Sequence, residues 1–341
     1  MKAQILYQQA QQLEKAGDQP AAAMAYRALA KLYYSQAIAS RGSARLALMQ
    51  AGESASKLAE TMRSSQKFNL RLSDIKGQEA AVTMFREQLI LPRQYPEAFQ
   101  RFNCEPDRGF LLYGPPGTGK TMLAQAISSE ISSAFYLISA DSLLNKYVGE
   151  SEANIIRLMK KARRNKTALL FFDEANALCD TDRQESDVIH RLVSVLAQQM
   201  EAPENQNLIF IAATNRPDRM DSRLLRPGRF GVWIYVGLPD RDAREEIAKA
   251  LLEDVPCETE NLADHIAALT NGCSGADVSR LTLHAKIRAS LRQAKILSSN
   301  MTTPVFLNFS DLKEALNTFH STVFQKDIDC CLDFKKKHNI P

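Results

Sequence analysis

The stretch that most constrains the fold is Gly114–Thr121, which reads Gly-Pro-Pro-Gly-Thr-Gly-Lys-Thr. It follows the apolar run Gly109–Tyr113 and precedes Met122–Ile127, which is spaced like the first turns of a helix. A strand, a glycine loop and a helix in this order are the setting in which the pattern G-x-x-x-x-G-K-[ST] binds phosphate. Backbone N–H groups and the helix N-terminus would surround the phosphate oxygens. We therefore expect a nucleotide site here rather than a turn without a ligand.

Two side chains at the end of this loop have separate expected roles. Lys120 would reach the β- and γ-phosphates, and the Thr121 hydroxyl would ligate Mg²⁺. The residues expected to surround the phosphates are Gly114, Pro115, Pro116, Gly117, Thr118, Gly119, Lys120, Thr121 and Met122.

The charge of the chain is balanced except at its N-terminal end. Of 341 residues, 43 are Lys or Arg and 39 are Asp or Glu, so a general nucleic-acid surface is not indicated. The whole net charge of +4 falls in residues 1–66, which hold eight basic and four acidic side chains. This excess fits either an ordinary solvated helical surface or an acidic partner.

Cysteine spacing and hydropathy indicate a compartment. The six cysteines show no C-x-x-C spacing, so neither zinc nor disulfides are expected. No apolar run approaches the ~18–20 residues of a membrane helix, and no signal peptide opens the sequence. We expect a cytoplasmic protein with reduced thiols and no transmembrane segment.

Residues 1–63 are predicted to form three helices, at 5–15, 21–40 and 43–62. Tyrosines in them are interpreted as packing residues. The pair of helices around Gly17-Asp18 also fits a single tetratricopeptide unit, but no second copy follows. A lone three-helix bundle is the better interpretation, and it resembles the MIT (microtubule-interacting and trafficking) domain in pattern and position.

After a short linker at 64–70, residues 71–239 predict an α/β fold with a doubly wound parallel sheet. An amphipathic helix is expected to reach Ile90 and to end at Leu91-Pro92. The five expected strands are 110–113, 134–140, 168–172, 208–213 and 232–236. Residues 240–341 show only helical patterns and are expected to form an all-helical lid with a closing helix at 326–338.

Polar residues at two strand ends complete the expected chemistry. Asp173 could hold Mg²⁺, while Glu174 could polarise the attacking water. Asn215, at the end of the fourth strand, could orient that water against the γ-phosphate. Arg226 and Arg229 lie too far along the chain to reach their own phosphates, so we expect them to act in trans as arginine fingers. Such a head-to-tail contact closes into a ring or winds into a spiral.

With these motifs in place, residues 70–338 resemble an AAA (AAA+) ATPase domain. Gly114–Thr121 matches Walker A, 169–174 matches Walker B, and Asn215 matches sensor 1. The resemblance implies ATP and Mg²⁺ as cofactors, a homo-hexamer, and further contact residues. These are Asp74, Ile75 and Gly77 on the adenine side, Gly275 and Ala276 near the end of the lid motif Thr270–Asp277, and Lys146, Tyr147 and Val148 in a pore loop that grips polypeptide.

The MIT-like start and the closing helix resemble the meiotic clade of that family, which contains katanin, spastin, fidgetin and the vacuolar-sorting ATPases. Some features differ from that clade. The linker is shorter, 301–305 leaves no room for a β insertion, and 225–229 is closer to the segregase and proteasomal branches. Ala175-Asn176 replaces the usual Ile/Val-Asp, and Cys273 replaces a larger residue at the adenine pocket.

The sequence therefore predicts an ATP-driven, ring-forming protein remodeller that pulls polypeptide with Tyr147. Its N-terminal helices would choose a client through an acidic amphipathic helix, strand or tail, with the third helix and its Lys57 and Arg63 as the expected docking face. The alternative is a slow, nucleotide-gated adaptor, which Ala175-Asn176 favours. An energy-dependent protease lacks its chemistry, because no H-E-x-x-H pattern occurs.

Overall fold

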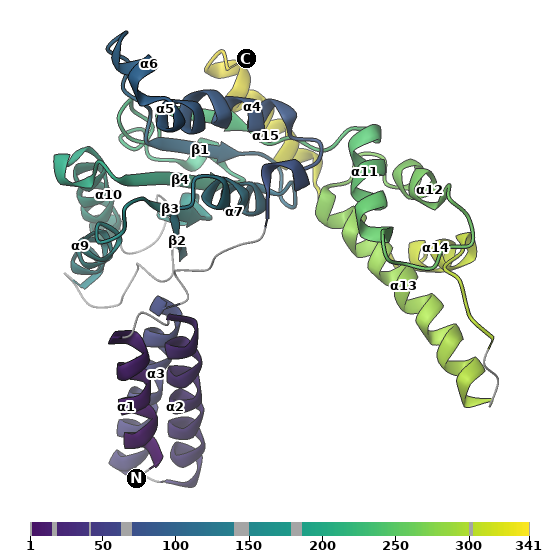
Figure 1. The fold of residues 1–341 in the computed structure, drawn as a ribbon, viewed down its shortest axis with the longest axis horizontal. Helices are drawn as coiled ribbons and strands as arrows, with labels where there is room; N and C mark the ends of the chain where they lie inside the picture. Colours follow the sequence, from purple (N-terminus) through teal and green to yellow (C-terminus); the bar gives the residue numbers. More distant parts are fainter. Residues whose placement is uncertain are drawn as a thin grey trace.

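The computed structural model describes residues 2–15, 19–40, 42–62, 70–139, 150–178, 186–299 and 303–340. Along the chain these ranges form a helical bundle, an α/β part around one sheet, and a helical lid (Figure 1). None of the helices within them combines the length and the apolar character needed to cross a membrane.

The N-terminal bundle consists of α1 (Lys2–Lys15), α2 (Gln19–Ala39) and α3 (Gly42–Met62). A Cβ added to Gly52 would lie 2.9 Å from the ring of Tyr34, so the helices approach closely there. Three of the five buried side chains among the described residues of its core are alanines: the five are Ala10, Tyr26, Leu29, Ala30 and Ala55. The alanine-rich interior thus permits the close helix packing that the sequence predicts.

The segment before the sheet differs from its prediction. Helix α4 (Glu79–Phe85) continues through a π-helical turn, η3 (Arg86–Ile90), directly into α5 (Leu91–Gln94). The helical run therefore does not end at Ile90. Pro92 lies in the first turn of α5, where a missing N–H and a fixed φ are tolerated. The wider π-helical turn therefore accommodates the proline without ending the helical run, and the prediction of a break at Leu91-Pro92 is wrong. The segment also contains the 3-10 turn η2 (Leu72–Asp74) and helix α6 (Pro96–Gln100).

Five parallel strands form one sheet in the order β2-β3-β4-β1-β5, which confirms the doubly wound α/β fold. The carboxyl ends of such strands meet at one edge, where ligands of open α/β sheets bind. Pairing of Tyr113 with Thr214 brings the ends of β1 and β4 side by side at this edge. The strands are β1 (Gly109–Tyr113), β2 (Ala134–Ser139), β3 (Ala168–Asp173), β4 (Leu208–Thr214) and β5 (Val232–Tyr235).

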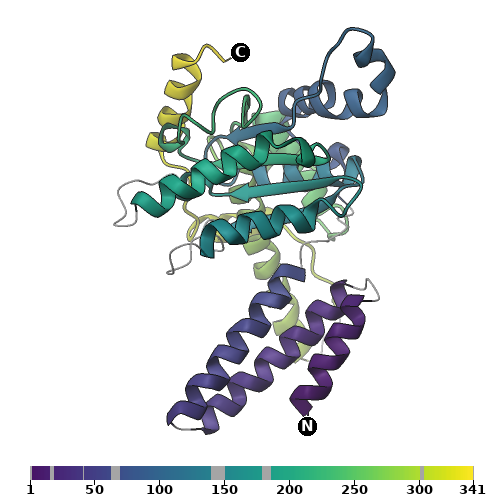
Figure 2. The ribbon, with the colours of Figure 1, turned by 90° about the vertical axis from the view of Figure 1, so that its left-hand side faces the viewer.

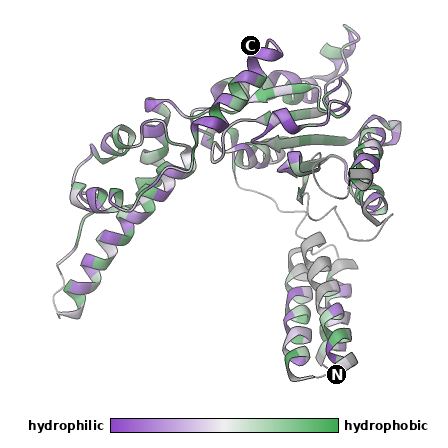
Figure 3. Cartoon of the chain, turned by 180° about the vertical axis from the view of Figure 1, so that it is seen from behind, coloured by the Kyte–Doolittle hydropathy of each residue, from purple (hydrophilic) through white to green (hydrophobic). Residues whose placement is uncertain are grey.

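Helices cover both faces of the sheet (Figure 2). Phe110 and Leu112 pack on one face with α4 and α7 (Lys120–Glu130), while Leu111 packs on the other with α9 (Glu150–Ala162) and α10 (Ser186–Glu201). Because both faces are buried, the strands are apolar along most of their length, as Figure 3 shows.

The lid packs four helices around its own core, in which Ile266, Leu281 and Leu312 are buried. Arg244 is also buried there, and its guanidinium donates to the backbone oxygens of Pro239 and Ala267. The helices are α11 (Arg241–Leu252), α12 (Leu262–Leu269), α13 (Gly275–Ser298) and α14 (Phe309–Leu316).

The closing helix α15 (Gln325–Lys337) was expected with the lid, but it packs on strands β1 and β5 of the sheet. The ring of Phe334 lies 5.2 Å from that of Tyr113 and 5.4 Å from that of Trp233, centre to centre. Buried Asp277 of α13 accepts hydrogen bonds from the Ser321 and Thr322 hydroxyls at 3.0 and 2.9 Å, which fixes the segment leading into this helix. Three further 3-10 turns are η4 (Ala175–Leu178), η5 (Pro203–Asn205) and η6 (Pro217–Arg219).

Candidate active site

The phosphate loop joins β1 to α7, as the sequence predicts. Gly117 and Gly119 have φ angles of +74° and +93°, a region that side-chain-bearing residues rarely adopt. The Lys120 ammonium donates to the carbonyl oxygens of Gly114 at 2.9 Å and Pro115 at 2.8 Å. Burial lowers the pKa of Lys120 to about 8, although the carboxylate of Asp173 opposes this shift. This lysine is therefore held inside the loop, where a phosphate would stabilise its charge.

The two expected metal ligands lie next to each other. The Thr121 hydroxyl donates to a carboxylate oxygen of Asp173 at 3.4 Å, although the two residues are 52 positions apart. Hydroxyl and carboxylate oxygens are the ligands that Mg²⁺ prefers, so these residues fit the ion. Glu174 is exposed beside them and has a φ of +51°, a strained conformation of the kind found at functional sites.

Asn215, the predicted sensor residue, follows β4 and is half buried. Its neighbour Thr214 donates a hydrogen bond to the side-chain oxygen of Asn176 at 2.8 Å and accepts one from the Arg216 backbone N–H at 2.9 Å. Asn176 thus links the turn after Asp173 and Glu174 to the end of β4. The sequence drew attention to Asn176 only as a departure from the family pattern, and this bond was not predicted.

The start of lid helix α13 touches the phosphate loop. The backbone N–H of Ala276 donates to the carbonyl oxygen of Gly117 at 3.1 Å. A Cβ on Gly117 would lie 2.6 Å from the Ser274 hydroxyl, so only glycine fits this contact. Ser274 and Asp277 cap the helix reciprocally. The structure therefore brings Gly275 and Ala276 to the loop, as the resemblance implies.

The predicted adenine-side segment lies against α7, through η2. Asp74 uses its carboxylate to cap η2, accepting from the Arg71 N–H at 2.8 Å. Ile75 packs on the sheet core, and Gly77 has a φ of +70° and leaves only 2.5 Å between its missing Cβ and that of Ala243. The segment thus joins the sheet to the first lid helix, and its contact with adenine stays a prediction.

A cysteine with no predicted contact to the site lies under the loop. Cys331 of α15 is fully buried, and its Sγ donates to the Asn215 carbonyl oxygen at 3.7 Å. Burial raises the pKa of this thiol to about 12, so it is neutral. The signal for this contact was the apolar stripe Ile328, Cys331 and Phe334, but nothing in the stripe indicates which surface it covers.

The two predicted arginine fingers lie at the opposite edge of the sheet. The Arg229 carbonyl oxygen lies only 1.5 Å from where a Cβ of Gly109 would be, and Gly109 begins the strand whose far end carries the phosphate loop. The Arg229 guanidinium donates to Glu201 at 2.7 Å and to the Arg223 carbonyl oxygen at 2.6 Å. This bond lowers the pKa of Glu201. Arg226 is exposed. The predicted pore-loop residues Lys146, Tyr147 and Val148 lie outside the described residues.

Comparisons with known proteins agree with this geometry. Residues 110–238 match the family described as "ATPase family associated with various cellular activities (AAA)". The chain is 38% identical over 221 residues to the Cell division cycle protein 48 homolog of Archaeoglobus fulgidus, covering 64% of this chain and 30% of that protein. It is 34% identical over 259 residues to the ATPase family gene 2 protein of Schizosaccharomyces pombe, covering 74% of this chain and 32% of that protein.

A third relative is the ATPase histone chaperone abo1 of Schizosaccharomyces pombe, 37% identical over 232 residues, which are 66% of this chain and 20% of that protein. The chain thus matches about a third or less of the length of each of these relatives. The matched family, the phosphate loop and the neighbouring Thr121 and Asp173 agree, and the chain contains an AAA ATPase domain.

Proposed function

We propose that this chain hydrolyses ATP with Mg²⁺ and uses the energy to remodel a protein client as a ring-forming motor. The observation that carries the proposal is the meeting of Lys120, Thr121 and Asp173 at the carboxyl edge of the sheet. This edge is where phosphate, metal and attacking water must converge.

Each side chain has a role that follows from its chemistry. Lys120 exchanges loop carbonyls for phosphate oxygens, while Thr121 and Asp173 would hold Mg²⁺, which neutralises charge on the phosphates. Glu174 accepts the proton of the attacking water, and Asn215 orients that water. Because the Ala276 N–H at the start of lid helix α13 donates to the Gly117 carbonyl oxygen, a movement of the loop on nucleotide exchange would also move the lid.

Arg226 and Arg229 support a composite site. Arg226 precedes and Arg229 follows a Pro-Gly turn that lies against the start of β1. The length of β1, about 17 Å, separates this turn from the phosphate loop. They therefore act on the nucleotide of a neighbouring subunit in a head-to-tail ring, which we propose to be a hexamer. Arg229 forms an ion pair with Glu201, while the side chain of exposed Arg226 can approach the neighbour's phosphate.

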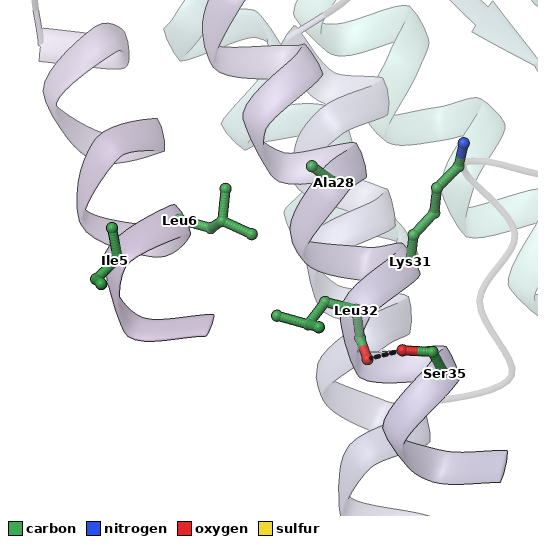
Figure 4. Close-up of a pocket in the computed structure, with 6 residues that line it drawn as sticks. All are labelled: Ile5, Leu6, Ala28, Lys31, Leu32 and Ser35. Atoms are coloured by element: carbon green, nitrogen blue, oxygen red, sulfur yellow. Dashed lines mark hydrogen bonds between the residues drawn. The ribbon is translucent and has the colours of Figure 1, made fainter. Parts of the chain in front are cut away.

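The N-terminal bundle is the proposed recruiter of clients. A groove of about 510 Å³ runs between α1 and α2, with Leu6 and Leu32 directed toward each other (Figure 4). Lys31 of α2 also lines it, with its ammonium directed away from α1 (Figure 4). Exposed Met24 and Ile38 extend the apolar stripe of α2 beyond the groove. An amphipathic helix would dock here through apolar residues at i, i+3, i+4 and i+7.

Charge argues for acidic residues on the rim of that helix. Helix α2 contains Arg27 and Lys31 and no acidic residue, whereas the two bases of α3 are balanced by two acids. Among the three described helices, α2 therefore has the largest positive excess. We place the docking site at the α1–α2 groove instead of on α3, which the sequence favoured and whose predicted docking residue Arg63 lies outside the described residues.

The test of hydrolysis is Glu174→Gln, with the exposed lid carboxylate variant Glu253→Gln as a control. Removing the base while keeping the phosphate and metal ligands should preserve ATP binding and reduce turnover by about 100-fold or more. Unchanged turnover in Glu174→Gln would show that another group activates water. Stimulation of the wild-type rate by an unfolded polypeptide separates a motor from a slow nucleotide-gated adaptor, which would not respond.

A further inference from the structure

A second pocket, of about 610 Å³, lies at the end of the sheet opposite the phosphate loop. Arg108 just before β1, Thr167 just before β3 and Gln206 shortly before β4 line it. The segment with α5 and α6 covers it, at the end of the sheet away from the lid (Figure 1). Because parallel strands begin at one edge and end at the other, this pocket is separate from the nucleotide site.

The charges that line this pocket are unbalanced. Arg93, Arg108 and Lys166 contribute three positive charges, and Glu130 contributes one negative charge. Within the described part of the chain, neither guanidinium has a hydrogen bond or an ion pair, and the buried Nε of Arg93 and one terminal nitrogen of Arg108 lack any partner. Burial and the nearby Arg108 lower the pKa of Arg93. Two like charges with unpaired buried donors are costly, and an acceptor would remove that cost.

The lining also fixes the class of that acceptor. Guanidinium groups present paired N–H donors that match the oxygens of phosphates and carboxylates. The excess of two positive charges fits a ligand with two negative charges. Side-chain amides and hydroxyls add neutral donors, and Pro92, Phe99 and Ile131 add an apolar wall. The volume lies within the range of small-molecule sites, roughly 300–1,000 Å³.

We propose that this pocket, between the α5–α6 segment and the amino-terminal edge of the sheet, binds a compact dianion, either a phosphate monoester or a dicarboxylate, through Arg93 and Arg108. The site is additional to the ATP site and is independent of the proposed remodelling function. An anion bound here would tie α5 and α6 to the strand starts and would stabilise the folded chain.

Isothermal titration calorimetry of the full chain with inorganic phosphate and, separately, with succinate tests the proposal. The Lys120→Ala background keeps phosphate from being retained at the nucleotide loop. One site per chain is expected, and Arg93→Gln or Arg108→Gln should each weaken it by about tenfold or more. Arg101→Gln, an exposed arginine of the same segment outside the pocket, should leave the affinity unchanged. The anion that binds more tightly, phosphate or succinate, identifies the class of ligand.

Thermal unfolding provides a second measurement that does not depend on catalysis. Without anion, Arg108→Gln should melt at a higher temperature than its parent, because the like-charge pair is relieved. At one and the same anion concentration the parent should gain more stability than Arg108→Gln, because the weakened site is less occupied. The proposal is overturned if neither anion binds to or stabilises the Lys120→Ala protein at millimolar concentration, or if Arg93→Gln and Arg108→Gln bind as well as their parent.

Discussion

At the residue scale, Lys120 is held in surroundings that disfavour its own charge. Burial lowers its pKa from 10.5 to about 8, so between these values the folded chain has lost a proton that the unfolded chain retains. Stability rises with pH wherever the unfolded state binds more protons. In this window the lysine should therefore raise the free energy of unfolding by on the order of 3 kcal/mol.

Urea unfolding of the nucleotide-free protein at both ends of this window, compared with Lys120→Met, measures the effect. The buried thiol of Cys331, whose pKa is raised to about 12, changes stability in the opposite direction in both proteins. The difference between them isolates the lysine, and the wild type should gain more stability with rising pH. Equal gains in both proteins would mean that Lys120 titrates normally.

The sequence was sufficient to predict that Gly114–Thr121 joins a strand to a helix and that Thr121 and Asp173 lie together, because short motifs mark both positions. Their roles toward phosphate and Mg²⁺ stay predictions. The partners of Asn176 and Cys331 could not be predicted in this way. Each depends on a contact between side chains far apart in the chain, 38 residues for Asn176 with Thr214 and 116 for Cys331 with Asn215. Only the packed sheet brings such pairs together.

At the element scale, α15 is held to the sheet by few side chains, so one truncation should release it. Phe334→Ala removes the ring that packs on Tyr113 and Trp233 and should cost about 3 kcal/mol. Buried Cys331 should then react faster with a thiol reagent, measured by mass spectrometry of the labelled peptide. Lys337→Ala, at the exposed end of the same helix, is the control. Unchanged Cys331 labelling in Phe334→Ala would show that α15 stays in place without this ring.

The groove of the N-terminal bundle makes a second prediction at this scale. The double reversal Arg27→Glu/Lys31→Glu should weaken binding of an acidic amphipathic peptide to the full chain by about tenfold, and should leave basal ATPase activity intact. Binding to the wild type should also weaken with salt, because rim charges are screened. Arg45→Glu, on α3, is the matched control. Fluorescence anisotropy of a labelled peptide gives the affinities, and an effect of Arg45→Glu alone would return the docking site to α3.

Helix and strand positions followed from hydrophobic period and from Gly and Pro signals, and most predicted boundaries lie within a few residues of those observed. The exceptions have physical causes. The helical run continues past Pro92 by way of a π-helical turn. Such turns have no sequence signal as clear as a glycine or proline. The closing helix was predicted as an element, but its packing surface depends on complementarity with β1 and β5.

At the scale of the whole molecule, the phosphate loop and the arginine turn occupy opposite edges of one sheet. Gly109 and Tyr113 are the two ends of β1, with the Arg229 carbonyl at the first and the phosphate loop after the second. A rigid, doubly covered sheet cannot bring these edges together within one chain. The proposed function therefore requires that a complete site be shared by two subunits.

Mixing two inactive variants tests this requirement most directly. Glu174→Gln lacks the activating carboxylate and Arg226→Ala lacks the exposed finger. Each alone should therefore hydrolyse ATP at about a hundredth of the wild-type rate or less. In mixed assemblies, an intact Glu174 from one chain can face an intact Arg226 from its neighbour. If the site is shared, ATPase activity should reappear on mixing and should peak at intermediate ratios. Absence of activity at every ratio, with mixed assembly verified by mass spectrometry, would contradict a site shared between subunits.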